Sequence, residues 1–368
     1  MKPYQLQTPR KIIFGRGASA DAAQHITAHG THIALIHGAN PKRAQWLIDA
    51  LHKAGAQVHP LPCPSEPTLP MLESALTTLR PKQIDAVVGL GGGAPLDLTK
   101  ALAALIPATG DPLDHLEVVG RGLPLTANPL PFIAIPTTSG TGAEATKNAV
   151  IGVPEHARKV SLRDDRMLAT LALVDPALTD HCPKAITLAS GVDAITQVIE
   201  PYISSKATPL TDALCKPAIP LGLQALKTLM QHEDPDARDT LAHVALTSGI
   251  ALANSGLGAV HGLAGVIGGL TPAPHGAVCG ALLAPVLKTN AEALPDNSKI
   301  AEVQTLIATT LGDLHNFTQT HGLPTLQAMG VAPTDHAKIA QAAAASSSMK
   351  GNPTPLSETQ LIACLAAA

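Results

Sequence analysis

The sequence predicts a doubly wound, mostly parallel α/β domain in residues 1–180 and an all-helical domain in residues 181–368. Two observations predict this division. Up to about residue 180, short apolar runs alternate with helical patterns, which is typical of α/β proteins. Beyond Pro183, long apolar periodic segments follow one another with short Gly/Pro breaks and no clear strand. The segment LVDPALTDHCP supplies turn residues at the boundary, and a length of 368 residues is sufficient for two domains.

Each element of the first domain is predicted from a local pattern. Four apolar runs are predicted to be strands: HIALIH (32–37), AQVHPL (56–61), DAVVGL (85–90) and PFIAIP (131–136). Three segments between them have helical periodicity: PKRAQWLIDALHKAG (41–55), PMLESALTTLR (70–80) and PLDLTKALAAL (95–105). Because a helix connects one strand to the next, the strands are expected to pair in parallel.

The second domain is predicted to contain only helices. They are expected at about 184–205, 209–231, 236–256, 259–268, 275–291, 297–312, 334–347 and 357–367. One stretch, from Thr240 to Leu287, contains no Asp, Glu, Lys or Arg. It is rich in Gly and Ala and its hydrophobicity per residue is weak, so we expect a buried helix pair there rather than a membrane span.

Composition argues against several classes of protein. Hydrophobic residues make up 45% of the chain and aromatic residues 2%, so the core must be aliphatic. The net charge is -3 and the cationic residues are scattered, which argues against a nucleic-acid partner. The five cysteines form no CxxC pair, and the N-terminus lacks the apolar core of a signal peptide. We therefore expect a reduced, cytoplasmic setting and no membrane partner.

Two glycine-rich runs directly follow predicted strands. In GLGGGAPLDLTK (89–100), glycines allow the backbone to approach a ligand, and the N-terminus of the following helix attracts phosphate. PTTSGTGAE (136–144) offers hydroxyl groups and amides around a polar ligand. Either run alone also fits an ordinary turn or helix cap. Together, at the carboxyl ends of two strands, they predict a dinucleotide site.

The candidate nucleotide-binding residues lie in these runs and after the first predicted strand. Dinucleotide sites often have an acidic residue after that strand, but HGANPKRAQ (37–45) has Gly38 there, with two cations close behind. This slightly favours NADP(H) over NAD(H), because no carboxylate repels a 2′-phosphate. The alternative is that the cations are solvated residues of a surface helix. The candidates are Gly38, Lys42, Arg43, Gly91, Gly92, Gly93, Asp97, Thr137, Thr138 and Thr141, with Asp97 expected to contact a ribose or cap the helix.

Asp193, His261 and His275 are candidate metal ligands. The two histidines lie in the charge-free stretch, where a buried imidazole needs a polar partner. They flank the segment GLAGVIGGLTPAP, whose turn is expected to bring them together, and Gln197 shares a helix face with Asp193. Two nitrogens and one carboxylate suffice to hold a divalent metal with open positions for a substrate. The alternative is that each histidine is an ordinary hydrogen-bonded core residue.

The chain resembles the iron-containing (group III) alcohol dehydrogenases, which are related to glycerol dehydrogenase and dehydroquinate synthase. The motifs that carry the resemblance run in order along nearly the whole chain: FGRGA (14–18), GGGAPLDLTK, PTTSGTGAEAT, LVDPALT (173–179), GVDAITQVIEPY (191–202), HGLAGVIGGLTPAPHGAV (261–278) and KGNPTPLSETQL. The resemblance implies a dehydroquinate synthase-like fold, with nicotinamide and metal held in a cleft between the two domains.

The resemblance also implies roles for single residues. Asp193, His261 and His275 match three metal ligands, and Lys159 matches a lysine near the cofactor. Two positions depart from the family pattern. Gln197 stands where DAxxHAxE has a ligand histidine, and Gly265 stands at the second place of HxxxH. A neutral amide is a poorer ligand than imidazole for a borderline metal, and the missing histidine removes a candidate proton relay.

The resulting hypothesis is an NAD(P)-linked oxidoreductase, NADP slightly preferred, that interconverts an alcohol and an aldehyde or ketone. Its metal, iron(II) or zinc, is held by Asp193, Gln197, His261 and His275, with water as the proton carrier. One alternative is a metal-independent enzyme similar to maleylacetate reductases, and another is a non-catalytic nucleotide-binding homologue. A homodimer is expected because dimers are common among relatives of this kind, with KIIFG a candidate for pairing across the two-fold axis.

Overall fold

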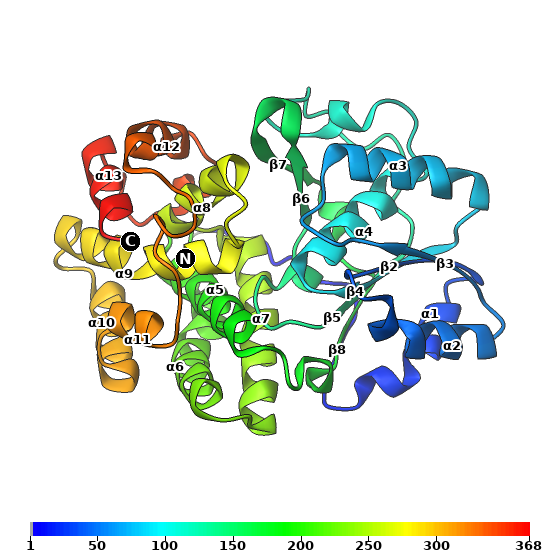
Figure 1. Ribbon diagram of the computed structural model, residues 1–368, viewed down its shortest axis with the longest axis horizontal. Helices are drawn as coiled ribbons and strands as arrows, with labels where there is room; N and C mark the ends of the chain where they lie inside the picture. Colours follow the sequence, from blue (N-terminus) through cyan, green and yellow to red (C-terminus); the bar gives the residue numbers. More distant parts are fainter. Residues whose placement is uncertain (1–2) are drawn as a thin grey trace. The chain divides into compact units, whose positions relative to one another are not determined.

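The computed structural model describes residues 3–368, which divide into two compact units. The α/β unit comprises Gln7–Thr138 and Ala143–Thr179. The helical unit comprises Asp180–Ala368, the short loop Ser139–Gly142 and an N-terminal segment that ends at Leu6. In Figure 1 the strands of the α/β unit run from blue to green, and the helices α5 to α13 of the helical unit run from green to red.

A six-stranded sheet, in which every pairing is parallel, forms the centre of the α/β unit. The strand order is β1-β8-β5-β4-β2-β3. The strands are β1 (Ile12–Phe14), β2 (His32–His37), β3 (Gln57–Pro62), β4 (Ala86–Gly91), β5 (Phe132–Pro136) and β8 (Leu171–Val174). The predicted fold class is confirmed, and β2, β3, β4 and β5 lie within one residue of their expected bounds. Their nearly continuous apolar runs reflect burial of the central strands on both faces.

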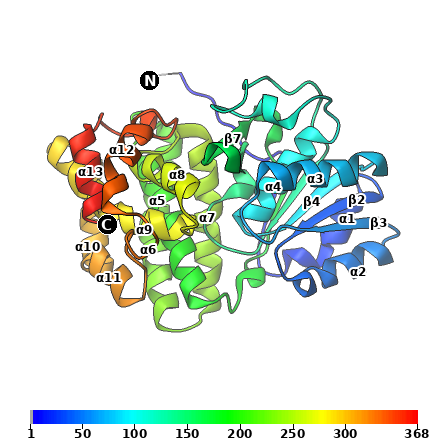
Figure 2. The ribbon, with the colours of Figure 1, turned by 45° about the horizontal axis from the view of Figure 1, so that its top comes forward.

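Helices cover both faces of this sheet (Figure 2). On one face, α3 (Leu69–Leu79) and α4 (Gly93–Leu105) pack their leucines against the strands. On the other face lie α1 (Ala22–Thr27) and α2 (Gln45–Lys53). The helix expected at 41–55 is shorter than predicted, because Asn40 caps a separate 3-10 turn at Pro41–Arg43 before α2 begins.

Several elements of the α/β unit are not predicted by the sequence patterns. They are α1, the short strands β1 and β8, and the antiparallel hairpin of β6 (Asn148–Val153) and β7 (Arg158–Arg163). Asp175, directly after β8, accepts hydrogen bonds from the backbone N–H groups of Gly17 and Ser19 and from the Ser19 hydroxyl. The motifs FGRGA and LVDPALT therefore lie side by side, and β1 pairs with β8 within the same chain.

The helical unit follows the predicted order of helices closely. It contains α5 (Lys184–Ile203), α6 (Pro209–Gln231), α7 (Pro235–Ser255), α8 (Ala259–Leu270), α9 (His275–Ala293), α10 (Ser298–Leu311), α11 (Leu314–Thr320), α12 (His336–Ala344) and α13 (Glu358–Ala366). Only the two-turn helix α11 was not expected. Between residues 180 and 368 the structure has no strand, as predicted. Side chains cap many of these helices, including Thr208 at α6 and Asp234 at α7.

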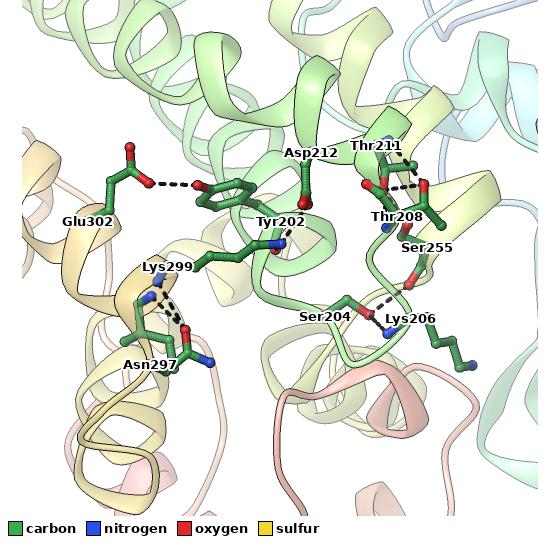
Figure 3. A network of polar contacts seen from close by, with 11 residues as sticks. Tyr202, Ser204, Lys206, Thr208, Thr211, Asp212, Ser255, Asn297, Lys299 and Glu302 are labelled. Atoms are coloured by element: carbon green, nitrogen blue, oxygen red, sulfur yellow. Dashed lines mark hydrogen bonds and ion pairs between the residues drawn. The ribbon is translucent and has the colours of Figure 1, made fainter. Parts of the chain in front are cut away.

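The helices form one aliphatic core around α5. A polar network fixes the C-terminal end of α5 against its neighbours (Figure 3). The ammonium group of Lys299 on α10 lies 2.6 Å from the Asp212 carboxylate on α6 and 2.9 Å from the carbonyl oxygen of Tyr202. The Tyr202 hydroxyl donates a hydrogen bond of 2.6 Å to Glu302. These contacts hold in place the helix that carries Asp193, Gln197 and Glu200.

Of residues 3–368, no single helix has the length and apolarity to span a membrane. The pair α7 and α8 passes such a test by length and composition together, but it is bent by 98° at the break.

Candidate metal and nucleotide sites

Three helices of the helical unit bring the predicted metal ligands to one point. Asp193 lies in the middle of α5, His261 in the first turn of α8 and His275 at the start of α9. The Nε2 atom of His261 is 3.3 Å from Asp193 Oδ1, and the Nε2 atom of His275 is 4.0 Å from the same oxygen. Residues fourteen apart in the sequence thus meet through the turn that connects α8 to α9.

Asp193 Oδ1 is buried and accepts no hydrogen bond from the residues that the structure describes. A buried carboxylate oxygen without a donor is costly unless a proton or a cation lies beside it. Burial tends to raise the pKa of Asp193, but His261 and the charge of His275 hold that pKa below its usual range. The carboxylate is therefore ionised and available as a ligand.

Glu200 fixes the orientation of His261. One carboxylate oxygen of Glu200 lies 2.6 Å from His261 Nδ1, and the other accepts the backbone N–H of Val260 at 2.8 Å. The carboxylate can approach this closely because position 258 is glycine, where a Cβ atom would lie 2.9 Å from Glu200 Oε1. A carboxylate partner keeps a proton on Nδ1, so a metal would displace the proton from Nε2, the atom that faces Asp193, as in other metal-ligating histidines.

Cys279 is a member of this cluster that the sequence reasoning missed. It is fully buried on α9, and its sulfur lies 3.6 Å from Nε2 of His261 and 3.6 Å from Nε2 of His275. Asp193, His261, His275 and Cys279 each offer a ligand atom, and these atoms all lie within 4.8 Å of one another. The sequence offers one sign of this role: Cys279 follows His275 by four residues on a helix, and residues with this spacing share one helix face.

Electrostatics at the cluster favour positive charge. The charge of a Cys279 thiolate, despite burial, raises the pKa of His275 to about 9. Burial opposes charge on His261, but Cys279, Glu200 and Asp193 together hold the pKa of His261 well above its usual value. The carboxylates of Asp193 and Glu200 beside two imidazoles thus give an electrostatic environment that suits a divalent cation.

The two positions that depart from the family pattern lie close to the cluster. Gln197, one turn after Asp193, is buried, and its amide nitrogen donates a hydrogen bond of 3.2 Å to the carbonyl oxygen of Gly140. Gly265 lies in the middle of α8, and a Cβ atom built there meets no described residue within 4 Å. Position 265 is therefore open, with space for a side chain that this sequence does not supply.

The two glycine-rich loops meet at the carboxyl edge of the sheet. β4 and β5 are neighbours, and Thr137 donates its backbone N–H to the carbonyl oxygen of Gly91 at 3.0 Å. The Thr138 hydroxyl would lie 3.1 Å from a Cβ atom at Gly92, so only a glycine leaves this approach unhindered. Gly93 begins α4, and among the described residues no side chain caps this helix. The first N–H groups of α4 thus remain available to an anion.

Other predicted nucleotide residues have different surroundings. Asp97 is engaged by the backbone N–H of Val150 at 3.1 Å and by buried Lys100 at 3.5 Å, so it ties α4 to β6. The alternative that Asp97 caps α4 is wrong, because no side-chain hydrogen bond caps this helix and its first turn contains no acidic residue. Lys159, on β7, forms an ion pair with Glu66.

The remaining candidate nucleotide-binding residues are Gly38, Lys42 and Arg43, which follow β2, and Thr141, which belongs to the helical unit. Gly38 follows β2 directly, and Lys42 and Arg43 are exposed on the 3-10 turn before α2. Thr141 lies in the loop Ser139–Gly142, which joins the helical unit through a close contact between Gly142 and Gly249 on α7.

Comparison with known proteins places this fold and site in a family. The profile "Iron-containing alcohol dehydrogenase" matches residues 9–176, and "Fe-containing alcohol dehydrogenase family, C-terminal" matches residues 187–368. The NAD-dependent methanol dehydrogenase of Bacillus methanolicus is 30% identical, over 94% of both chains. The probable alcohol dehydrogenase EutG of Salmonella typhimurium is 30% identical, over 98% of this chain and 93% of that protein.

Solved structures agree with this assignment. A 1,3-propanediol oxidoreductase has a TM-score of 0.90 at 28% identity and covers 99% of each chain. An alcohol dehydrogenase from Oenococcus oeni has a TM-score of 0.88 at 25% identity and covers 100% of each chain. The protein is therefore an oxidoreductase acting between alcohols and carbonyl compounds. It belongs to the iron-containing alcohol dehydrogenase family, as the sequence motifs indicated.

Proposed function

We propose that this protein is a metal-assisted, NAD(P)-linked dehydrogenase of a small-molecule alcohol or carbonyl substrate. The observation that supports the metal most directly is the convergence of Asp193, His261 and His275 around a buried carboxylate oxygen without a hydrogen-bond donor. When bound, a divalent iron or zinc ion supplies a Lewis acid for the substrate oxygen, and a nicotinamide supplies or accepts the hydride.

The residues of the chain have distinct parts in this proposal. Asp193 provides an anionic ligand, and His261 provides a neutral nitrogen whose tautomer Glu200 selects. His275, half-buried at the start of α9, provides the second nitrogen. Gln197 keeps its amide oxygen available as a further, weaker ligand while its nitrogen is held by Gly140. With glycine at position 265, solvent water carries the proton.

The nucleotide-binding part of the proposal depends on the α/β unit. Gly91, Gly92 and Gly93 and the uncapped start of α4 suit a pyrophosphate, with Thr137 and Thr138 beside them. Lys159 leaves its ion pair with Glu66 and contacts the cofactor instead. The name of the Bacillus methanolicus relative supports NAD, whereas Lys42 and Arg43 provide charge for the 2′-phosphate of NADP. We further propose a cytoplasmic homodimer.

Replacement of His275 tests the proposal. His275→Ala is expected to abolish turnover on a panel of alcohols and aldehydes while leaving nucleotide binding, measured by fluorescence titration, within about twofold of wild type. His243→Ala, at an exposed position of α7, is the matched control and should retain activity. Wild-type activity that survives exhaustive chelation, with no metal detected by elemental analysis, would instead favour the metal-independent alternative. Nucleotide binding without turnover in wild type would favour a non-catalytic homologue.

A further inference from the structure

Cys279 occupies the position of a fourth ligand in the cluster. It lies on α9 one turn after His275, and it is fully buried from solvent. The sulfur faces the Nε2 atoms of both histidines at equal distances of 3.6 Å. Both histidines are therefore positioned to share a ligand sphere with this thiol.

Three of the distances between ligand atoms are close to those of a tetrahedral metal site. With bond lengths of about 2.0 Å to N or O and about 2.3 Å to S, tetrahedral ligand atoms lie about 3.3 Å apart for N and O pairs and about 3.5 Å apart for N and S pairs. The observed distances are 3.3 Å between Asp193 and His261, and 3.6 Å from Cys279 to each histidine. The 4.0 Å distance from His275 to Asp193 is longer by less than 1 Å.

Cys279 also accounts for the glutamine in place of a ligand histidine. The nitrogen of the Gln197 amide is held by Gly140, and a neutral amide oxygen is a weak ligand for a borderline metal. A thiolate is a strong ligand for such a metal, and its charge adds to that of Asp193 to balance a divalent cation. The site therefore has four protein ligands without Gln197, and a substrate oxygen would bind as a fifth ligand.

We propose that Cys279 binds the metal as a thiolate, completing an Asp193–His261–His275–Cys279 site that prefers zinc over iron(II). The proposal deepens the proposed function, since it depends on the same three ligands. It differs from that function in assigning a sulfur ligand to the site. Metal binding without a sulfur ligand would therefore contradict this inference alone.

Cobalt(II) substitution of the full-length apoprotein tests it by absorption spectroscopy. Wild type is expected to bind one Co²⁺ with a near-ultraviolet sulfur-to-cobalt charge-transfer band and the intense visible bands of a tetrahedral ion. Cys279→Ser and Cys279→Ala should lose the charge-transfer band. Zn²⁺ affinity, measured by chelator competition, should fall in both variants by more than the 10- to 100-fold typical of losing an outer partner of a ligand. Cys364→Ser, at another buried cysteine of the helical unit, is the control and should keep the band.

The outcomes separate the inference from the proposed function. Stoichiometric Co²⁺ binding by wild type without the charge-transfer band overturns the thiolate ligand while sparing the metal site. The same conclusion follows if the band persists in Cys279→Ala. No Co²⁺ or Zn²⁺ binding by wild type overturns both proposals. The wild-type spectrum decides the first question even if neither Cys279 variant folds.

Discussion

The contact between Glu200 and His261 makes a sharp prediction for Glu200→Gln. In wild type, both carboxylate oxygens of Glu200 accept hydrogen bonds, at 2.6 Å from His261 Nδ1 and at 2.8 Å from Val260 N–H. The glutamine oxygen can still accept from Val260, which turns its NH₂ group towards Nδ1. His261 must then accept at Nδ1 and carry its proton on Nε2, the atom that faces Asp193.

Metal binding to this variant requires reversal of the tautomer, which breaks the new hydrogen bond. The expected cost is about 1.4–2.7 kcal/mol, a 10- to 100-fold increase in Kd for Zn²⁺, as for other partners of ligand histidines. The assay is competition with a chromophoric chelator at constant pH. Glu233→Gln is the matched control, because Glu233 accepts hydrogen bonds from Arg238 elsewhere in the helical unit. Equal Zn²⁺ affinity in wild type and Glu200→Gln would refute the assigned tautomer and its role.

Four other predictions depend on the local surroundings of single residues. Gly265→Ala should raise the thermal unfolding midpoint, since its Cβ meets no described residue within 4 Å and alanine favours a helix by about 1 kcal/mol. Gly276→Ala should lower the midpoint, because its Cβ would lie 2.4 Å from a backbone oxygen of α5, and the reverse order would contradict the packing. Burial raises the pKa of Glu144 from 4.5 to about 7, so the folded protein retains a proton that the unfolded chain releases, and stability falls from pH 4.5 to 7 by about 3 kcal/mol. Urea unfolding at pH 5 and 8 should show a smaller fall in the free energy of unfolding for Glu144→Gln than for wild type. An equal fall in both proteins would contradict this explanation. Replacement of Lys42 and Arg43 by Ala should weaken NADP⁺ binding more than NAD⁺ binding in titrations, and an equal effect on both nucleotides would assign the cations to the solvated surface.

Much of the fold follows from periodicity. The strands β2, β3, β4 and β5 are apolar runs long enough to be recognised, and helices such as α6 have clear start and stop residues. β1 and β8 have only three and four residues, and their place depends on pairing with each other and with β5. The β6–β7 hairpin is stabilised partly by contacts with distant Asp97 and Lys100, which local sequence does not reveal.

The candidate site was predictable as far as it depends on residue type. Asp193, His261 and His275 are polar residues in apolar segments, and the structure brings them together. Beyond its spacing from His275, nothing in the sequence distinguishes Cys279 from any other buried cysteine; only its distances to both histidines do so. Asp97 shows the converse difficulty, because its position in a glycine-rich motif does not disclose that Lys100 and Val150 already occupy its carboxylate.

Anomalous diffraction from crystals of the metal-loaded protein tests the metal site most directly. Data collected at the zinc and iron absorption edges are expected to show one strong peak about 2.0–2.3 Å from the ligand atoms of Asp193, His261 and His275. Crystals of protein that carries stoichiometric metal, but with no anomalous peak at these three residues, would contradict the account.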